Sequence, residues 1–422
     1  MTQENSIQTV SVVGLGYIGL PTAAMLASRR TRVIGVDVNK HAVDTINQGK
    51  IHIIEPGLDS IVRDVVREGF LRATTTPEPA DAFLIAVPTP FKDDYEPDLT
   101  YIEKATQALA PVLKKGNIVI LESTSPVGAT EQMIEWLAAL RPDLKMPTTN
   151  GVDGDIYAAY CPERVLPGQV VRELVENDRI IGGINKVSAE RAKAVYRIFV
   201  EGELLETNAR TAEMSKLTEN AFRDVNIAFA NELSLICDKL DINVWDLISL
   251  ANHHPRVNIL QPGAGVGGHC IAVDPWFIVN KTPGEARITR VAREINDAKP
   301  EWVVSKIKAA VDKIAATGKP RCDVNVAVLG LAFKPNIDDL RESPAIHIAE
   351  SIAQFSESRM ILVEPNIEKL PRQFDGYELT DCQEAVNTAD VIAILVKHSA
   401  FEKINFSAKP DQIVIDAVGL LN

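Results

Sequence analysis

A cysteine inside a glycine-rich stretch is the first candidate for chemistry in this chain, although for a lone cysteine a structural role is the more frequent one. Residues 262–275 read PGAGVGGHCIAVDP, so Cys270 follows Gly267 and Gly268 closely, and Asp274 lies four residues further on. Glycine at this density disfavours helix or strand and lets the backbone approach a bound group closely. The thiol is then either a nucleophile or a small buried hydrophobic side chain, because free cysteine is among the most buried residue types.

A second glycine-rich stretch favours binding of a dinucleotide. Residues 14–19 read GLGYIG and lie between an expected strand at 8–13 and an expected helix at 20–30, and the next strand, 31–36, ends in an acid. The first glycine allows a tight turn, the second admits a pyrophosphate, the third lets helix pack on strand, and the helix start offers N–H groups to phosphate. The acid would bind the ribose hydroxyls and repel a 2′-phosphate, so we expect NAD rather than NADP; the alternative is a glycine turn without a ligand. The candidate cofactor contacts here are Gly14, Gly16, Tyr17, Ile18, Gly19 and Asp37.

Hydroxyl side chains follow two further expected strands, 82–87 and 117–121. Ligands of open parallel sheets bind beyond the carboxyl ends of the strands. Thr89, Thr124 and Thr130 are therefore candidate cofactor contacts, although helix capping explains such residues equally well.

A proline-flanked loop, CPERVLPG, places Glu163 beside Arg164 directly after a short apolar segment. A carboxylate there could handle a proton or a water molecule. The alternative, a solvated surface pair, is slightly favoured by the sequence alone.

Residues 208–240 contain neither glycine nor proline and are expected to form one helix. Lys216, Asn220 and Arg223 are spaced four and three apart and share a face, which suits an anionic, hydroxyl-rich ligand as well as it suits solvent. Apolar residues at three-four spacing predict a buried stripe, and apolar character on more than one side suggests packing against another subunit. The stripe consists of Leu217, Ala221, Val225, Ala228, Phe229, Leu233, Ile236 and Leu240.

The second half of the chain repeats a strand–helix pattern, with strands expected at 324–329, 360–363, 391–395 and 412–415. It lacks GxGxxG, so we do not assign it NAD; Lys334 and Arg341 would suit a diphosphate better. Ser343 is a plausible helix N-cap.

Upstream, the sequence HHPR places His254 and Arg256 where they could meet a phosphate or carboxylate, or simply form a turn.

Composition narrows the class of protein. The 422 residues are 46% hydrophobic and carry a net charge of −13, which argues against nucleic acid as a partner. No apolar run approaches the roughly 18 residues of a membrane span, and the N-terminus lacks a signal-peptide pattern. Five scattered cysteines without a CxxC pair indicate neither a disulfide framework nor a zinc site. We expect a soluble, cytoplasmic protein without a metal.

Taken in order, GLGYIGLP, PTP, ESTSPVG, CPERVLPG, the Lys216–Asn220 helix, PGAGVGGHC and GLAFKPNIDDLRESP resemble the UDP-glucose/GDP-mannose dehydrogenase family over essentially the whole chain. Within it, CPERVLPG, HHPR and GGHCIAVDPWF are most similar to members that oxidise UDP-N-acetyl-D-mannosamine for bacterial surface polysaccharides. The resemblance implies a four-electron oxidation of the sugar C6 alcohol to a carboxylate with two NAD⁺, through a thiohemiacetal and a thioester on Cys270.

Further roles come from the same resemblance. Lys216 matches a proton-transfer and oxyanion-stabilising lysine, Asn220 and Asp274 match residues that orient it or the water, and Glu163 matches a carboxylate that assists thioester hydrolysis. Arg256 would reach the site of a partner subunit, which implies a homodimer. The positions that match nucleotide-sugar contacts are Arg164, Val165, Lys216, Asn220, Arg223, His254, Arg256, Gly267, Lys334 and Arg341.

We therefore expect an α/β chain with two Rossmann-like doubly wound domains, joined by a long central helix and a small helical domain. The expected boundaries are 1–207 for NAD binding, 208–305 for dimerisation and the catalytic loop, and 306–422 for the UDP moiety. The alternatives are a UDP-glucose or UDP-N-acetylglucosamine 6-dehydrogenase, a two-electron dehydrogenase of the 6-phosphogluconate or hydroxyacid type, and a non-catalytic NAD-sensing protein.

Overall fold

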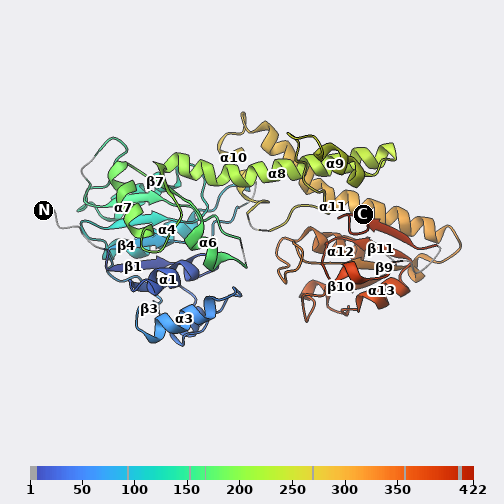
Figure 1. Ribbon diagram of the computed structural model, residues 1–422, viewed down its shortest axis with the longest axis horizontal. Coiled ribbons are helices and arrows are strands. Elements are labelled where there is room, and N and C mark those ends of the chain that lie inside the picture. The colour runs from blue at the N-terminus through green and yellow to red at the C-terminus, as the bar shows by residue number, and fades with distance from the viewer. Residues whose placement is uncertain are drawn as a thin grey trace. The chain divides into compact units, whose positions relative to one another are not determined.

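The computed structural model describes residues 7–92, 95–151, 154–166, 168–268, 270–355, 358–406 and 411–422. The chain divides into two compact units, residues 1–219 and residues 220–422. Each unit is built on one β-sheet, and the boundary lies inside the long helix α8 (Ala209–Leu240) (Figure 1). The expected helix at 208–240 is thereby confirmed.

The first unit contains an eight-stranded sheet in the order β3-β2-β1-β4-β5-β6-β7-β8. All neighbours pair in parallel except β6 and β7, which are antiparallel. The strands are β1 (Thr9–Val13), β2 (Arg32–Val36), β3 (Leu71–Thr74), β4 (Ala82–Ile85), β5 (Ile118–Leu121), β6 (Tyr157–Tyr160), β7 (Arg179–Gly183) and β8 (Leu204–Asn208). The helices are α1 (Gly19–Ser28), α2 (Lys40–Asn47), α3 (Leu58–Arg67), α4 (Thr100–Leu109), α5 (Ala129–Leu140), α6 (Val170–Glu176) and α7 (Lys186–Tyr196).

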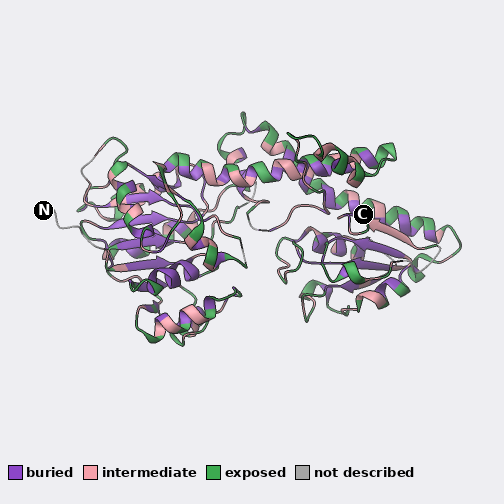
Figure 2. Ribbon diagram, in the orientation of Figure 1, coloured by how far each residue is buried: buried purple, intermediate pink, exposed green. Residues whose placement is uncertain are grey.

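The central strands of this sheet are apolar throughout because helices cover both of their faces. Every residue of β4 and β5 is buried, as Figure 2 shows in purple. Such continuous apolar runs are typical of parallel sheets. The strand order reverses between β1 and β4, and open α/β sheets bind their ligands at that switch point.

Helix α8 has one buried face and one exposed apolar face. Leu217, Ala221 and Ala228 are buried, as their spacing predicted. The prediction that Phe229, Ile236 and Leu240 continue this stripe is wrong for the single chain, because these side chains are about half exposed. They lie on another side of the helix from the residues that bond to α11 (Arg287–Ala315).

The second unit contains a four-stranded parallel sheet in the order β10-β9-β11-β12. Its strands are β9 (Asn325–Leu329), β10 (Arg359–Val363), β11 (Val391–Ile394) and β12 (Ile413–Asp416), and its remaining helices are α9 (Val244–Asn252), α10 (Asp274–Lys281), α12 (Pro344–Phe355) and α13 (Cys382–Thr388). The Ser343 hydroxyl accepts a hydrogen bond from the backbone N–H of Ala345, so its N-cap role is confirmed.

The predicted fold class, two Rossmann-like sheets with a long central helix, is confirmed. The finer division at residues 207 and 305 stays a prediction. Across the described ranges, no helix combines the length and the apolar character that crossing a membrane requires.

Candidate active site

The turn after β1 has the backbone geometry that its glycines predicted. Gly14 has φ +92°, and a Cβ there would lie 2.5 Å from the carbonyl oxygen of Ala86; a Cβ on Gly19 would lie 1.8 Å from the carbonyl oxygen of Gly14. A Cβ on Gly16 would meet nothing within 4 Å. Two of the glycines are thus required by the fold, and the third faces open space at the start of α1, where a phosphate is favoured.

The carboxylate of Asp37 is held at the end of β2 beside this turn. Its Oδ2 accepts a hydrogen bond from the N–H of Leu15 at 2.8 Å, and its Oδ1 accepts one from the N–H of Asn39 at 2.8 Å. Each oxygen keeps a further lone pair for a ribose hydroxyl. Nearby, burial lowers the pKa of His52, while the charge of Asp37 acts in the opposite direction. The turn, the helix start and the acid together fit a dinucleotide without a 2′-phosphate.

Two of the three candidate threonines lie together at the strand ends, and the third is engaged elsewhere. The hydroxyl of Thr89 donates to the carbonyl of Thr124 at 2.5 Å. Thr130 is fully buried, and its hydroxyl donates at 2.7 Å to Glu213, a residue of α8 that the sequence analysis missed. Glu213 also accepts from the N–H of Gly128 and so caps α5; burial raises its pKa. A cofactor contact by Thr130 stays a prediction.

Glu163 belongs to a buried ionic cluster, so the interpretation of a solvated surface pair was wrong for this carboxylate. Only 7% of Glu163 is exposed. One oxygen accepts from the N–H of Arg164 at 2.6 Å, and the other accepts from the guanidinium of Arg179. A carboxylate in this setting has a fixed orientation.

Arg179 bridges Glu163 to a second acid, Glu122, at 3.1 Å, and the hydroxyl of Tyr196 donates to the same Glu122 oxygen at 2.7 Å. Burial raises the pKa of Glu122 to about 7, against the opposing charge of Arg179. None of Glu122, Arg179 and Tyr196 was predicted from the sequence. The available signal was an arginine at the start of an otherwise apolar strand, β7, where a buried charge requires a partner.

The residues that follow Glu163 in the loop lie in different surroundings. Arg164 forms an ion pair with Glu219 of α8, with 2.8 Å between Nε and Oε1. Val165 packs against the apolar core of the unit. The loop itself is anchored by Glu55, whose carboxylate accepts from the N–H groups of Gly168 and Val170.

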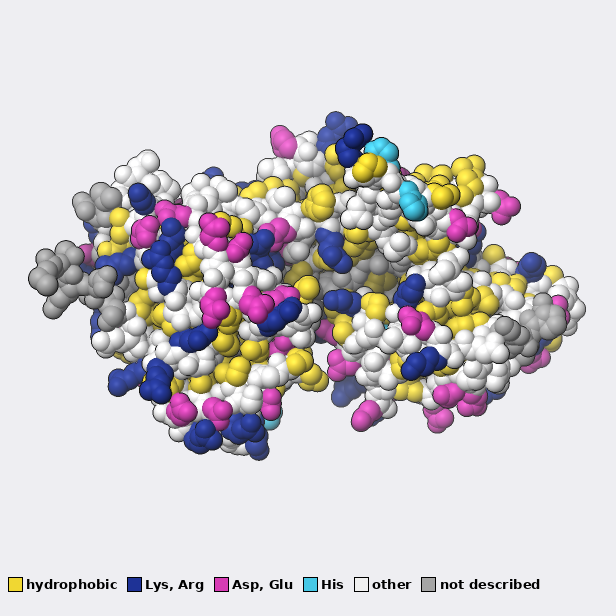
Figure 3. Space-filling view, viewed as in Figure 1, with side chains coloured by type: hydrophobic (Ala, Val, Ile, Leu, Met, Phe, Trp, Pro, Cys, Tyr) yellow, Lys and Arg dark blue, Asp and Glu magenta, His cyan; other side chains and the backbone are white. Residues whose placement is uncertain are grey.

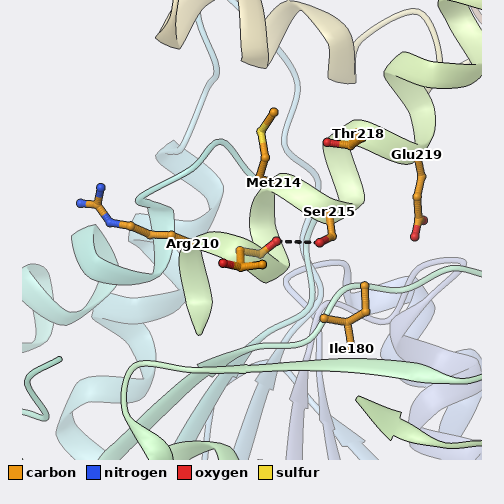
Figure 4. Close-up of a pocket in the computed structure, with 7 residues that line it drawn as sticks. Ile180, Arg210, Met214, Ser215, Thr218 and Glu219 are labelled. Atoms are coloured by element: carbon orange, nitrogen blue, oxygen red, sulfur yellow. Dashed lines mark hydrogen bonds between the residues drawn. The ribbon is translucent and has the colours of Figure 1, made fainter. Parts of the chain in front are cut away.

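A hollow of about 530 Å³ lies beside the first half of α8, and Figure 4 shows Met214, Ser215, Thr218 and Glu219 projecting from the helix around it. Ile180 of β7 faces them. None of the predicted site residues lines this hollow, and only Glu219 connects it to the loop of Arg164.

In the second unit, Cys270 lies four residues before the start of α10. Its carbonyl accepts a hydrogen bond from the N–H of Asp274, the first residue of α10, at 2.8 Å. Cys270 is exposed, whereas Cys161 and Cys237 are buried, and burial raises the pKa of the Cys161 thiol. Exposure contradicts the interpretation of Cys270 as a buried hydrophobic residue and leaves it accessible to a carbonyl carbon.

Asn220 and Asp274, two of the predicted site residues, are in direct contact. The amide Nδ2 of Asn220 donates to Oδ2 of Asp274 at 2.5 Å. Asp274 is buried at the start of the helix that follows Cys270, so this bond ties α8 to the cysteine segment. Lys216 is one helical turn before Asn220 in α8 and is half-buried, and Arg223 is exposed.

The glycine loop packs closely against the loop after β9. A Cβ on Gly267 would lie 2.3 Å from the carbonyl oxygen of Glu342, and one on Gly268 would lie 3.0 Å from the ring of Phe333. The N–H of Gly263 donates to the side chain of Asn231 in α8 at 2.9 Å. The glycines are therefore required for contact with the segment that carries Lys334 and Arg341.

The remaining predicted contacts are exposed basic side chains. His254 and Arg256 form a turn after α9, with the N–H of Arg256 donating to Nδ1 of His254 at 3.3 Å. Arg341 pairs with Asp339, and Lys334 is exposed. The exposed arginine and lysine side chains in these two segments suit an anionic ligand.

Polar residues on the buried side of α8 were also missed. Asp224 forms a buried ion pair with Arg293 of α11 at 2.7 Å, and Asn231 donates to Asn296 at 2.8 Å. Lys299 donates to the hydroxyl of Ser234. Apolar periodicity could not reveal these pairs, because their partners lie about 65 to 70 residues apart in the sequence. Within the described ranges, no group of three or more His, Cys, Asp or Glu side chains could hold a metal ion.

Comparison with known families divides the chain into three matches. Residues 8–200 match the NAD binding domain of the UDP-glucose/GDP-mannose dehydrogenase family, residues 210–298 match its central domain, and residues 327–422 match its UDP binding domain.

Individual relatives align over nearly the full length. The UDP-N-acetyl-D-mannosamine dehydrogenase of Escherichia coli K12 is 63% identical over 417 residues, which cover 98% of this chain and 99% of the relative. An NDP-N-acetyl-D-galactosaminuronic acid dehydrogenase of Ralstonia nicotianae is 60% identical over 413 residues, 98% of this chain and 96% of the relative. Among solved structures, the UDP-N-acetyl-mannosamine dehydrogenase Cap5O of Staphylococcus aureus superposes with a TM-score of 0.85 at 44% identity, covering 98% of this chain and 95% of that one.

Proposed function

Because the chain belongs to the UDP-glucose/GDP-mannose dehydrogenase family, we propose that it oxidises the C6 hydroxymethyl of UDP-N-acetyl-D-mannosamine to a carboxylate, using NAD. The observation that carries this proposal is the 63% identity to the E. coli enzyme over 98% of the chain. Such a reaction requires an accessible thiol and polar groups that hold its segment in place. Cys270 is exposed, and Asn220 bonds to Asp274, four residues after it. Since both nucleotide substrates are intracellular metabolites, we place the reaction in the cytoplasm.

The glycine turn after β1 and Asp37 would hold the cofactor, with its pyrophosphate at the start of α1 and its adenine ribose on the carboxylate. When bound, NAD⁺ accepts the hydride in each of the two oxidations. Tyr17, Ile18, Thr89, Thr124 and Thr130 are the further proposed contacts.

Cys270 is the proposed nucleophile. After the alcohol has lost one hydride and one proton, the Cys270 sulfur forms a bond to the aldehyde carbon, and the carbonyl oxygen takes a proton to give a thiohemiacetal. Loss of a second hydride and of the hydroxyl proton leaves a thioester. Water then adds to that carbon, the C–S bond breaks, and the acid and the thiol are released, so two hydrides are removed and one water is consumed.

The other proposed catalytic residues move protons or fix groups in place. Lys216 takes the alcohol proton and stabilises the developing oxyanion, and Asn220 with Asp274 orients it or the water. Glu163 assists the hydrolysis; because Arg179 and the N–H of Arg164 occupy its oxygens, it would act by orienting water.

Exposed cations and the two loops supply the proposed contacts to the nucleotide sugar. Lys334 and Arg341 lie in the segment matched to the UDP binding domain, and Gly267 packs against that segment. The further proposed contacts are Arg164, Val165, Arg223, His254 and Arg256.

A 2-acetamido sugar of another configuration is the second candidate substrate, because a relative named for N-acetyl-D-galactosaminuronic acid is 60% identical over 98% of this chain. UDP-glucose and UDP-N-acetylglucosamine are less favoured alternatives. A panel of UDP- and GDP-sugars with NAD, scored as NADH released per sugar consumed, tests the proposal. We expect two NADH per UDP-N-acetyl-D-mannosamine; one NADH per sugar would indicate a two-electron dehydrogenase, and binding without turnover would indicate an NAD sensor.

A homodimer formed through α8 completes the proposal. Phe222, Phe229 and Ile236 are spaced seven residues apart on α8, and 71% of Phe222 is exposed. Leu240 and Leu250 extend the apolar surface, and Figure 3 shows hydrophobic side chains gathered around α9 and the end of α8. A contiguous apolar surface of this kind supports a subunit interface. Arg256, in the exposed turn after α9, would reach the partner's site.

Subunit mixing tests the role of Arg256. Arg256→Ala and Cys270→Ala homodimers should each be nearly inactive. If Arg256 acts in the partner's site, a mixed dimer has one site with both residues intact and regains activity. If Arg256 acts within its own subunit, every site in the mixed dimer lacks one of the two residues, and mixing restores nothing.

A further inference from the structure

The turn after β9 in the second unit repeats the turn after β1 in the first. The N–H of Gly14 donates to the carbonyl of Val36 at 2.8 Å, and the N–H of Gly330 donates to the carbonyl of Val363 at 2.8 Å. The two glycines have φ +92° and +93°. In both units, therefore, the glycine after the first strand (β1 or β9) bonds in the same way to the last residue of the neighbouring strand (β2 or β10).

The two units also share an acid directly after the second strand of each pair, Asp37 after β2 and Glu364 after β10. Asp37 accepts from the N–H of Leu15 at 2.8 Å, and Glu364 accepts from the N–H of Leu331 at 2.8 Å. Glu364, however, is 4% exposed and also accepts from the N–H of Ala332. It has no surface left for a ribose, so this acid serves another purpose in the second unit.

That purpose involves a fully buried histidine, His398, which follows β11. Its Nε2 lies 3.0 Å from Oε2 of Glu364. Its Nδ1 lies 2.9 Å from the backbone nitrogen of Asn336 and 3.0 Å from the side-chain nitrogen of Asn366. Since both of these nitrogens carry hydrogens, Nδ1 is an acceptor and Nε2–H donates to Glu364, which defines a neutral imidazole.

His398 thus connects the end of β10 to the middle of a long loop. Helix α1 begins five residues after Gly14, but α12 begins fourteen residues after Gly330, so residues 331–343 form an extended loop in place of a tight turn. Asn336 adopts φ +62°, and its side chain accepts from the N–H and the hydroxyl of Ser399 at 2.9 and 3.0 Å. These hydrogen bonds fix the loop to the residues that follow β11.

The same loop presents Lys334 and Arg341 and supports the catalytic segment. Phe333 packs against Gly268, two residues before Cys270, and the carbonyl of Glu342 lies against Gly267. Displacing the loop would therefore disturb both the nucleotide contacts and the support of the glycine loop.

We propose that His398 and Glu364 are positioning residues for UDP binding, which act together with Ser399 by holding the 331–343 loop at the backbone N–H and the side chain of Asn336. The proposal rests on the proposed function only in taking UDP as the ligand of this unit. Neither side chain is expected to touch the nucleotide, because both are buried.

Binding of UDP itself to the full-length protein, measured by calorimetry, tests this proposal with a matched pair of variants. His398→Asn retains an acceptor near Nδ1, whereas His398→Gln retains a donor near Nε2 and loses the acceptor for Asn336. We expect His398→Gln to weaken UDP binding about tenfold and His398→Asn to restore most of it, with NAD binding unchanged in both. Equal UDP affinity in His398→Gln and the wild type, or no recovery in His398→Asn, would overturn the proposal.

A second variant tests the proposal even if the histidine variants fail to fold. Asn336→Gly tolerates φ +62° and removes only the bonds to Ser399, so it should fold normally and weaken UDP binding by about three- to fivefold. His347→Gln, which alters an exposed histidine of α12, is the control that should bind as the wild type does. Unchanged UDP affinity in Asn336→Gly would contradict the proposal, whereas failure of the wild type to bind UDP would contradict the proposed function instead.

Discussion

Asn220 donates a hydrogen bond to Asp274 at 2.5 Å and so joins the long helix α8 to the helix that begins four residues after Cys270. Fifty-four residues separate the two side chains in sequence, and both are proposed catalytic residues. The bond fixes the cysteine segment against the helix that also carries Lys216.

Asn220→Ala should lower kcat by about ten- to a hundredfold, because a small displacement of the reacting groups has an effect of that size. The melting temperature should change little. Asn226→Ala is the matched control, because its amide bonds only to the carbonyl of Phe222 in the same helix. Loss of activity in both variants would assign the effect to the helix and not to the Asp274 contact.

Asp37→Asn should relax the preference for NAD over NADP, because it removes the negative charge that repels a 2′-phosphate. The amide oxygen can still accept from one of the two backbone N–H groups that Asp37 binds, those of Leu15 and Asn39. The ratio of kcat/KM for the two cofactors measures this effect, and we expect it to fall by about tenfold or more. Asp59→Asn, at an exposed site in α3, should leave the ratio unchanged. Unaltered selectivity in Asp37→Asn would show that this acid is not the ribose partner.

Lys299→Met should stabilise the protein at neutral pH. Lys299 is buried against Ser234 and Trp302, and burial lowers its pKa from 10.5 to about 8. The unfolded chain then binds more protons between pH 8 and 10.5, so the wild type gains stability as pH rises through this window. At pH 7 the variant should be more stable by about 1–3 kcal/mol, and this advantage should disappear near pH 10.5.

Thermal unfolding at pH 7 and pH 10 measures the difference, with Lys313→Met on the exposed end of α11 as the control. An advantage of equal size at both pH values would mean that Lys299 does not titrate abnormally.

Glu122→Gln should show the opposite pH dependence. Burial raises the pKa of Glu122 to about 7 from 4.5, so the folded wild type binds more protons in that window and loses stability as pH rises from 4.5 to 7. The glutamine variant lacks this loss, so its stability relative to the wild type should improve by up to about 3 kcal/mol across the window. A difference in melting temperature that does not vary between pH 5 and pH 8 would contradict this assignment.

The sequence predicted those features that depend on local pattern. The strands β1, β2, β4, β5 and β9 to β12, the glycine turn at Gly14 and the helix at 209–240 were accessible because apolar periodicity and glycine spacing act within a few residues, whereas β3, β6, β7 and β8 were not predicted. Cys270 and its neighbours were identified from motif resemblance, and the structure adds their contacts.

Buried polar pairs were not predictable in the same way. Glu163 was indistinguishable from a surface acid until Arg179, sixteen residues later, was placed against it. Phe229 and Ile236 were assigned to the core because periodicity identifies apolar faces but does not say which of two faces this chain itself covers. His398 gave no signal, since its role depends on a loop 62 residues earlier.

The most direct test of the covalent mechanism is the yield of uronate and NADH from UDP-N-acetyl-D-mannosamine with Cys270→Ser, compared with Cys322→Ser, which alters another exposed thiol. Both variants should bind NAD. With Cys270 as the nucleophile, Cys322→Ser should release two NADH and one uronate per sugar, and Cys270→Ser should form no uronate. Uronate production by Cys270→Ser at a near wild-type rate would contradict a thioester on this residue.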